Sequence, residues 1–116
     1  MTAKLSFNKS KRIKKSKDFN RIFAQGIKIN SEHFLLIYLH ADEKRFGFAV
    51  SQKIKGAVNK NKARRRLREL VRINQYKIPD NLNVIFIAKP GTEKVRFDIL
   101  ENELLQMLSQ LRKVDT

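Results

Sequence analysis

Apolar residues recur at helical spacing in three stretches of the chain. The first stretch predicts a short helix from Ser16 to Gln25, with Ser16 as its N-cap and Gly26 as its stop. The second predicts a long helix from Ala57 to Asn74 with a narrow apolar stripe, and the third a last helix from Phe97 to near Arg112 with a fuller stripe. Each helix therefore has one side suited to packing on a sheet.

Between these stretches lie apolar runs of strand length. Residues 34–39 and 45–50 are two such runs, joined by the polar turn 41–44, and they predict an antiparallel hairpin. A short edge strand is expected near residues 27–29. Residues 82–88 form a further buried-strand candidate bounded by turn residues on both sides.

The order helix, two or three strands, helix, strand, helix predicts one α/β domain, an α+β two-layer sandwich with helices packed on a mixed sheet. The length of 116 residues allows a single core. Residues 1–13 are basic with few apolar positions, so we expect a mobile N-terminus, and residues 14–113 are expected to form the domain.

Composition removes several classes of site. The chain has no cysteine, which excludes disulfides and thiolate metal sites. Its two histidines, His33 and His40, cannot build a zinc site alone, and we interpret His33 as a satisfied surface residue. The start lacks an apolar secretion signal, and no run approaches the ~20 apolar residues of a membrane span. A soluble, cytoplasmic protein is the expectation.

The net charge of +15 is confined to two segments. Residues 1–30 carry nine basic residues and one acid, and residues 52–72 also carry nine and one, so each segment has a net charge of +8. Residues 31–51 sum to −1 and residues 73–116 to zero. Such clustering favours two dedicated contact surfaces for a polyanion over a uniformly solvated basic protein.

The central basic segment is the strongest signal. Four basic residues repeat every four positions along one face of the predicted helix, and Lys62, Arg65 and Arg66 widen that face. Like charges at this spacing weaken an isolated helix by a few tenths of a kcal/mol per pair, and a phosphate backbone would reverse that effect. The candidate RNA-binding residues are Lys53, Lys60, Asn61, Lys62, Arg64, Arg65, Arg68 and Arg72.

Other readings fit this segment less well. A helix that docks on lipid usually has bulky apolar residues opposite its charges, whereas here that side carries Ala63, Leu67, Leu70 and Val71. A helix-turn-helix would need a short partner helix just before residue 57. Asn61 suits a sugar or phosphate contact but is equally an exposed polar residue, and Gly56 suits either a close backbone approach to a ligand or a tight turn.

The run KIKGAVNKNKARRRLREL resembles the signature of the bacterial ribonuclease P protein family. The central Arg-Asn-Arg of that signature is here Lys60-Asn61-Lys62, which keeps the charge but loses the planar fork of arginine. The family's Gly-Asn pair is shifted to Lys55-Gly56. Matching positions are Lys53, Ile54, Ala57, Val58, Asn61, Arg65, Arg68 and Glu69.

The likeness extends over about residues 10–112. Residues 14–26 resemble the family's opening helix, and the segments 34–38, 45–51 and 85–90 follow in the family's order. The resemblance implies a small sandwich with an uncommon left-handed βαβ crossover. It also implies a protein subunit that assists a catalytic RNA in removing the 5′ leader from precursor tRNA. In that family the chemistry resides in the RNA, which holds the Mg²⁺, so the partners implied are the catalytic RNA and the leader.

The resemblance also implies a leader-binding cleft on the sheet. Phe19, Phe23 and Phe34 match aromatic positions of that cleft, although each is alternatively a core residue. The phosphate contacts beside it would come from Lys14, Lys15, Lys17 and Arg21. An alternative is a ribosomal-type or chaperone RNA-binding protein with no role in leader cleavage. A protein-only nuclease would need clustered acidic metal ligands, which the sequence does not offer.

Overall fold

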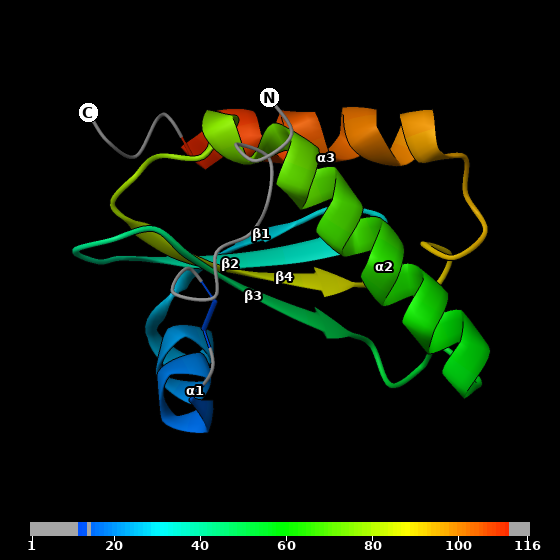
Figure 1. The fold of residues 1–116 in the computed structure, drawn as a ribbon, viewed down its shortest axis with the longest axis horizontal. Coiled ribbons are helices and arrows are strands. Elements are labelled where there is room, and N and C mark those ends of the chain that lie inside the picture. The colour runs from blue at the N-terminus through cyan, green and yellow to red at the C-terminus, as the bar shows by residue number, and fades with distance from the viewer. Residues whose placement is uncertain (1–11, 14, 112–116) are drawn as a thin grey trace.

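The computed structural model describes residues 12, 13 and 15–111. The predicted mobile N-terminus lies mostly outside these residues, as do Lys14 and Arg112. Three helices, four strands and a short 3-10 helix follow the predicted order within the described part of the chain (Figure 1). Their bounds are α1 Ser16–Gln25, β1 Ile27–Asn30, β2 Phe34–His40, β3 Arg45–Val50, α2 Ala57–Asn74, η3 Gln75–Lys77, β4 Leu82–Ala88 and α3 Phe97–Leu111.

The strands form one mixed sheet in the order β1-β2-β4-β3. β2 pairs antiparallel with both β1 and β4, whereas β3 pairs in parallel with β4. The hairpin predicted from residues 34–39 and 45–50 is therefore wrong, because β4 lies between β2 and β3. The polar turn after β2 spans the width of that inserted strand, and the backbone N–H of Ala41 donates to the carbonyl of Asn81 at the start of β4, at 3.0 Å.

The parallel pair β3 and β4 is connected through α2. In Figure 1 both strands run from left to right, and the chain returns through α2 in front of the sheet while it advances upward from β3 to β4. This path is a left-handed crossover, as the family resemblance implies and in contrast to nearly all βαβ units. It places α2 across one face of the sheet, which its residues from Ala63 onward contact.

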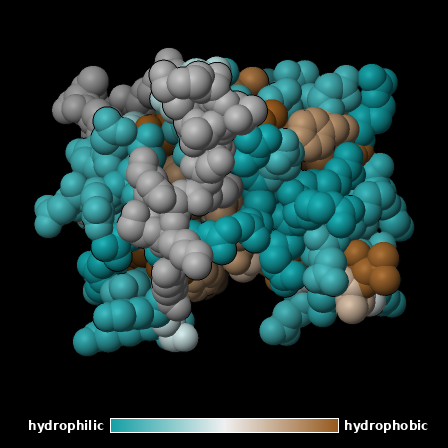
Figure 2. Space-filling view, in the orientation of Figure 1, coloured by the Kyte–Doolittle hydropathy of each residue, from teal (hydrophilic) through white to brown (hydrophobic). Residues whose placement is uncertain are grey.

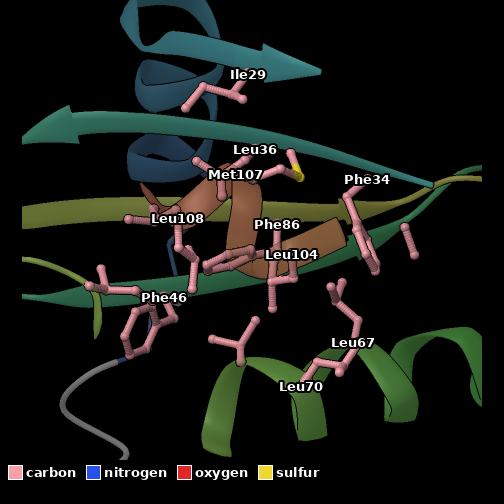
Figure 3. Packing of buried hydrophobic residues seen from close by; sticks show 14 of the residues in the cluster. Ile29, Phe34, Leu36, Phe46, Leu67, Leu70, Phe86, Leu104, Met107 and Leu108 are labelled. Carbon is pink, nitrogen blue, oxygen red and sulfur yellow. The ribbon is translucent and has the colours of Figure 1, made fainter. Parts of the chain in front are cut away.

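The two faces of the sheet carry different layers. The larger core lies between the sheet and the helices α2 and α3, and it includes Phe86, Leu67 and Leu104 (Figure 3). On the opposite face α1 covers part of the sheet, and Ile22 packs there against Ile37 and Ile85. The mixed α+β class is thus as predicted, with two helices on one face and a shorter one on the other.

Glycines fix the boundaries of α1 and α2. At Gly26 a Cβ atom would lie 2.6 Å from the carbonyl oxygen of Ile22, so only glycine fits where the chain leaves α1. Gly56 has a φ of 86°, which favours glycine, so the turn before α2 explains this residue without a ligand. Ser16 is not the N-cap of α1, since Lys15 occupies that position and no side chain caps the helix.

A buried polar network joins β2 to α3. The Glu103 carboxylate accepts hydrogen bonds from the Ser31 hydroxyl and from the backbone N–H of His33, the latter at 2.6 Å. Its other oxygen lies 2.7 Å from Nδ1 of His33, a residue that is 8% exposed. Thr92 donates to the His33 carbonyl at 3.1 Å. His33 is therefore satisfied, as expected, but it is a buried residue and not a surface one.

Candidate nucleic-acid interface

The two sides of α2 have opposite character. Its buried side chains face the sheet and α3, where they join the larger core, and they are Ala63, Leu67, Leu70, Val71 and Asn74. The other side carries the basic residues, and Figure 2 shows the surface over α2 as largely hydrophilic. Apolar packing thus anchors the helix and leaves its charges at the surface.

The predicted residues of α2 line a shallow hollow of about 340 Å³, formed by Asn61, Arg64, Arg65, Arg68, Glu69 and Arg72. Asn61 accepts a hydrogen bond from Arg64 at 3.1 Å, which orients that guanidinium group. Lys60 lies partly exposed on the same helix, and Lys53 and Lys62 are exposed nearby. The structure therefore places these predicted residues on or beside one helix.

Arg72 differs from the other arginines because it has an acidic partner. Its guanidinium donates to Glu69 at 2.9 and 2.5 Å. These hydrogen bonds lower the pKa of Glu69, and they raise the pKa of Arg72. The charge of Arg72 is thus partly compensated within the helix, so less of it is available to a ligand.

Arg66 does not widen the basic face, and this part of the prediction is wrong. Its guanidinium turns toward the loop before α3 and donates to the carbonyls of Thr92, at 2.8 Å, and Val95, at 2.6 Å. Its position between the apolar and basic sides of α2 allows it to reach that loop. Arg66 therefore connects α2 to the loop before α3.

A second group of predicted residues lies on α1. Phe19 is half-buried, and its ring lies over Gly47, where an added Cβ would be 3.0 Å from Cε2 of the ring. Phe23 is 42% exposed, with the Lys28 ammonium 5.3 Å from its ring centre. The basic residues of this helix and its N-cap, Lys15, Lys17 and Arg21, are exposed. Lys14 lies outside the described residues.

Phe34 does not belong to this group. Its side chain is 0% exposed and lies in the larger core, on the face of the sheet covered by α2 and α3 (Figure 3). Because side chains alternate along a strand, the neighbouring residue Leu35 points to the α1 face instead. Leu35 pairs with Ile87 of β4, and both are half-buried beside the α1 cluster.

Sequence reasoning missed Leu35 and Ile87 as surface residues of the α1 side. The apolar run of β2 is continuous, so it gives no sign of which residue faces which layer. The register with β4 supplies that information. Leu35, Ile87 and Phe19 pack against the α1 cluster and stay partly exposed, while Phe23 is exposed on α1 itself.

Two structural features are absent from the described residues. Within residues 12, 13 and 15–111, no group of three or more His, Cys, Asp or Glu is placed to hold a metal ion. In the same part of the chain, no helix is both long and apolar enough to span a bilayer.

Comparison with known proteins is consistent across sequence and structure. The model of the ribonuclease P family matches residues 7–112. The ribonuclease P protein component of Pelotomaculum thermopropionicum is 34% identical over 100 residues, which cover 84% of this chain and 89% of that protein.

Solved structures of this family have the same fold. The ribonuclease P protein of Thermotoga maritima superposes with a TM-score of 0.76 at 28% identity, over 85% of this chain and 96% of that one. A Staphylococcus aureus ribonuclease P protein mutant with defective mRNA degradation activity gives a TM-score of 0.79 at 29% identity, over 90% of both chains.

Proposed function

Because the chain belongs to the ribonuclease P protein family, we propose that it is the RNA-binding protein subunit of ribonuclease P, a tRNA-processing ribonuclease. In this role it assists the catalytic RNA in removing the 5′ leader from precursor tRNA. The observation that carries the proposal is the row of partly exposed cations on α2, most of which have no acidic partner among the described residues.

The α2 surface is the proposed contact with the RNA subunit. Arg64, Arg65 and Arg68 line one hollow, and guanidinium groups bind phosphate oxygens through paired hydrogen bonds. Lys60 and Lys62 add point charges along the same helix. Binding here would release counterions from the RNA and offset the repulsion between neighbouring cations.

The α1 side is the proposed contact with the leader. Unpaired bases stack on aromatic rings, a contact worth about 1–3 kcal/mol per base, and Phe23 and Phe19 offer partly exposed rings. Leu35 and Ile87 add apolar surface, while Lys15, Lys17 and Arg21 would bind the leader's phosphates. Two ligands can therefore be bound by separate helices of one domain.

The chemistry is assigned to the RNA. We assign Mg²⁺ to the RNA, where it would supply the activated water and stabilise the leaving group. This chain's own residues then position the leader and neutralise phosphate charge. Holding two reactants in place is a substantial catalytic contribution without any protein nucleophile.

Reconstitution tests the proposal directly. Combined with a bacterial ribonuclease P RNA at physiological magnesium, the protein is expected to accelerate removal of a precursor tRNA leader, measured as the rate of 5′ cleavage. The protein alone should cleave neither precursor tRNA nor an unstructured mRNA, an arm suggested by the S. aureus relative. Binding of structured RNA without faster leader removal would favour the ribosomal or chaperone alternative.

A further inference from the structure

A second hollow lies at the outer edge of β3, where three parts of the chain meet. Its volume is about 190 Å³, and it is lined by Arg12, Ile13, Phe46, Gly47, Phe48, Arg64 and Arg68. Arg12 is held there by its backbone, because it forms a parallel bridge with Phe46 and the next N–H, that of Ile13, donates to the Phe46 carbonyl at 2.9 Å. The hollow therefore joins the N-terminal basic segment to α2.

Arg68 is fixed in this hollow by a column of rings. Phe48 stacks on Phe86 with ring centres 5.8 Å apart and an interplanar angle of 18°. The Arg68 guanidinium lies 5.9 Å from the centre of the Phe48 ring, a cation–π contact. Because Phe86 is fully buried in the core, the column holds the guanidinium of Arg68 in a defined place.

The charges in the hollow are not compensated within the described protein. Among residues 12, 13 and 15–111, no carboxylate forms a salt bridge with Arg12, Arg64 or Arg68, and the side-chain partner of Arg64 is the neutral Asn61. Burial, followed by the nearby charges of Arg12 and Arg64, lowers the pKa of Arg68. Bringing three cations together costs electrostatic free energy, and a bound anion would remove that cost.

We propose that this hollow binds a single phosphate group of the RNA, held jointly by Arg12, Arg64 and Arg68, with Phe48 as the positioning residue for Arg68. The inference rests on the proposed function and names one contact within it. At about 30 Å³ per water, the hollow has room for about six water molecules, which suits a tetrahedral phosphate. The two basic segments, separated along the chain by residues 31–51, then act on one ligand group.

A double-mutant cycle tests this sharing. Affinity for a bacterial ribonuclease P RNA is measured against salt for Arg12→Gln, Arg68→Gln and the double variant. If one phosphate is shared, the double variant should lower the salt slope, that is, the slope of log affinity against log salt concentration, by about one, not two. Its affinity loss should also depart by about fivefold or more from the product of the single losses.

The matched control replaces Arg65, which does not line this hollow. Arg12→Gln combined with Arg65→Gln should lower the slope by about two, with losses that multiply. The proposal would be overturned if the affinity losses of Arg12→Gln and Arg68→Gln also multiplied and their double variant lowered the salt slope by two. Wild-type protein without salt-dependent RNA binding would instead refute the proposed function itself.

NMR spectroscopy distinguishes a site for an RNA phosphate from a site for free inorganic phosphate, and it also tests the positioning role of Phe48. In the free protein, inorganic phosphate should shift the NMR signals of the Arg12 and Arg68 side-chain N–H groups together, and Arg12→Gln should weaken the response of Arg68. Phe48→Leu should remove the ring-current shift of Arg68 and the coupling between Arg12 and Arg68. Joint shifts with inorganic phosphate but independent effects on RNA binding would mean a free-phosphate site and overturn the RNA contact.

Discussion

Helices α2 and α3 cover the same face of the sheet but use their charges differently. On α3 the acidic residues bond within the protein: Glu103 to Ser31 and His33, and Glu101 to Asn74 of α2. On α2, Arg64, Arg65 and Arg68 form no salt bridge with a described residue. Acidic charge on α3 thus bonds within the fold, whereas three arginines of α2 have no acidic partner in the described part of the chain.

The largest expected effect comes from removing charge from α2. Replacing Arg65 and Arg68 together with Ala should weaken binding to the ribonuclease P RNA by about 3 kcal/mol, roughly a hundredfold, because two charge-assisted phosphate contacts are lost. The salt slope should fall by about one to two. Filter binding over a range of salt concentrations measures both quantities.

The matched control removes the same charge elsewhere. Lys94 and Arg96 are exposed in the loop before α3, and Arg96 pairs with Asp98. Replacing both with Ala should change RNA affinity by less than about threefold. An equal loss in the two double variants would mean that net charge alone, and not the α2 surface, binds the RNA.

A smaller effect, on stability, is expected from α3. Glu103→Ala leaves Ser31 and the buried His33 without their acceptor, so it should destabilise the domain by about 2–3 kcal/mol. Thermal denaturation should show a drop of roughly 10 °C. RNA affinity measured well below the transition should be unchanged, since Glu103 lies on a different helix from the basic surface. Asp98→Ala, an exposed change on the same helix, is the control and should cost below about 1 kcal/mol.

The stability that the Glu103 network contributes should depend on pH in the acid range. Burial alone would raise the pKa of Glu103, but hydrogen bonds from the Ser31 and His33 side chains and from the His33 backbone outweigh it and lower that pKa. The carboxylate therefore adds stability above the unfolded-state pKa of about 4.3, and this stability is lost as the pH falls through the folded-state value. The difference between wild type and Glu103→Gln should shrink in acid; a constant difference would exclude this ionic contribution.

The smallest expected effect concerns the leader. Phe23→Ala should reduce the preference of the reconstituted enzyme for precursor over mature tRNA by about 1–2 kcal/mol, because one stacking ring is lost. Affinity for mature tRNA should not change. Tyr76→Ala removes another exposed ring, distant in sequence and located in η3, and serves as the control. Equal losses of affinity for precursor and mature tRNA would mean that Phe23 does not contact the leader.

Much of this architecture could be predicted from local signals. The bounds of α1 and α2 follow from glycines at their ends and from apolar spacing. Strand pairing could not be predicted in this way, because the insertion of β4 between β2 and β3 depends on contacts across 30 or more residues of chain. The resemblance, and not the apolar pattern, pointed to the left-handed crossover.

The site was predictable where charge alone defines it. The basic residues of α2 form one surface because a four-residue spacing repeats on one side of a helix. The direction of Phe34 and the inward turn of Arg66 depend on the register of β2 and on the loop before α3, which no local pattern encodes. The meeting of Arg12 with Arg68 likewise requires the tertiary fold.

The central place of β4 has a consequence for how the chain matures during synthesis. β2 can pair with β1 early, but β3 gains its neighbouring strand, and β2 its second one, only when residues 82–88 have left the ribosome. The apolar side of α2 emerges before that moment and has no completed sheet to pack on. Non-local pairing of this kind slows folding, so the nascent chain carries an exposed, highly cationic helix through the RNA-rich surroundings of the ribosome until its last central strand arrives.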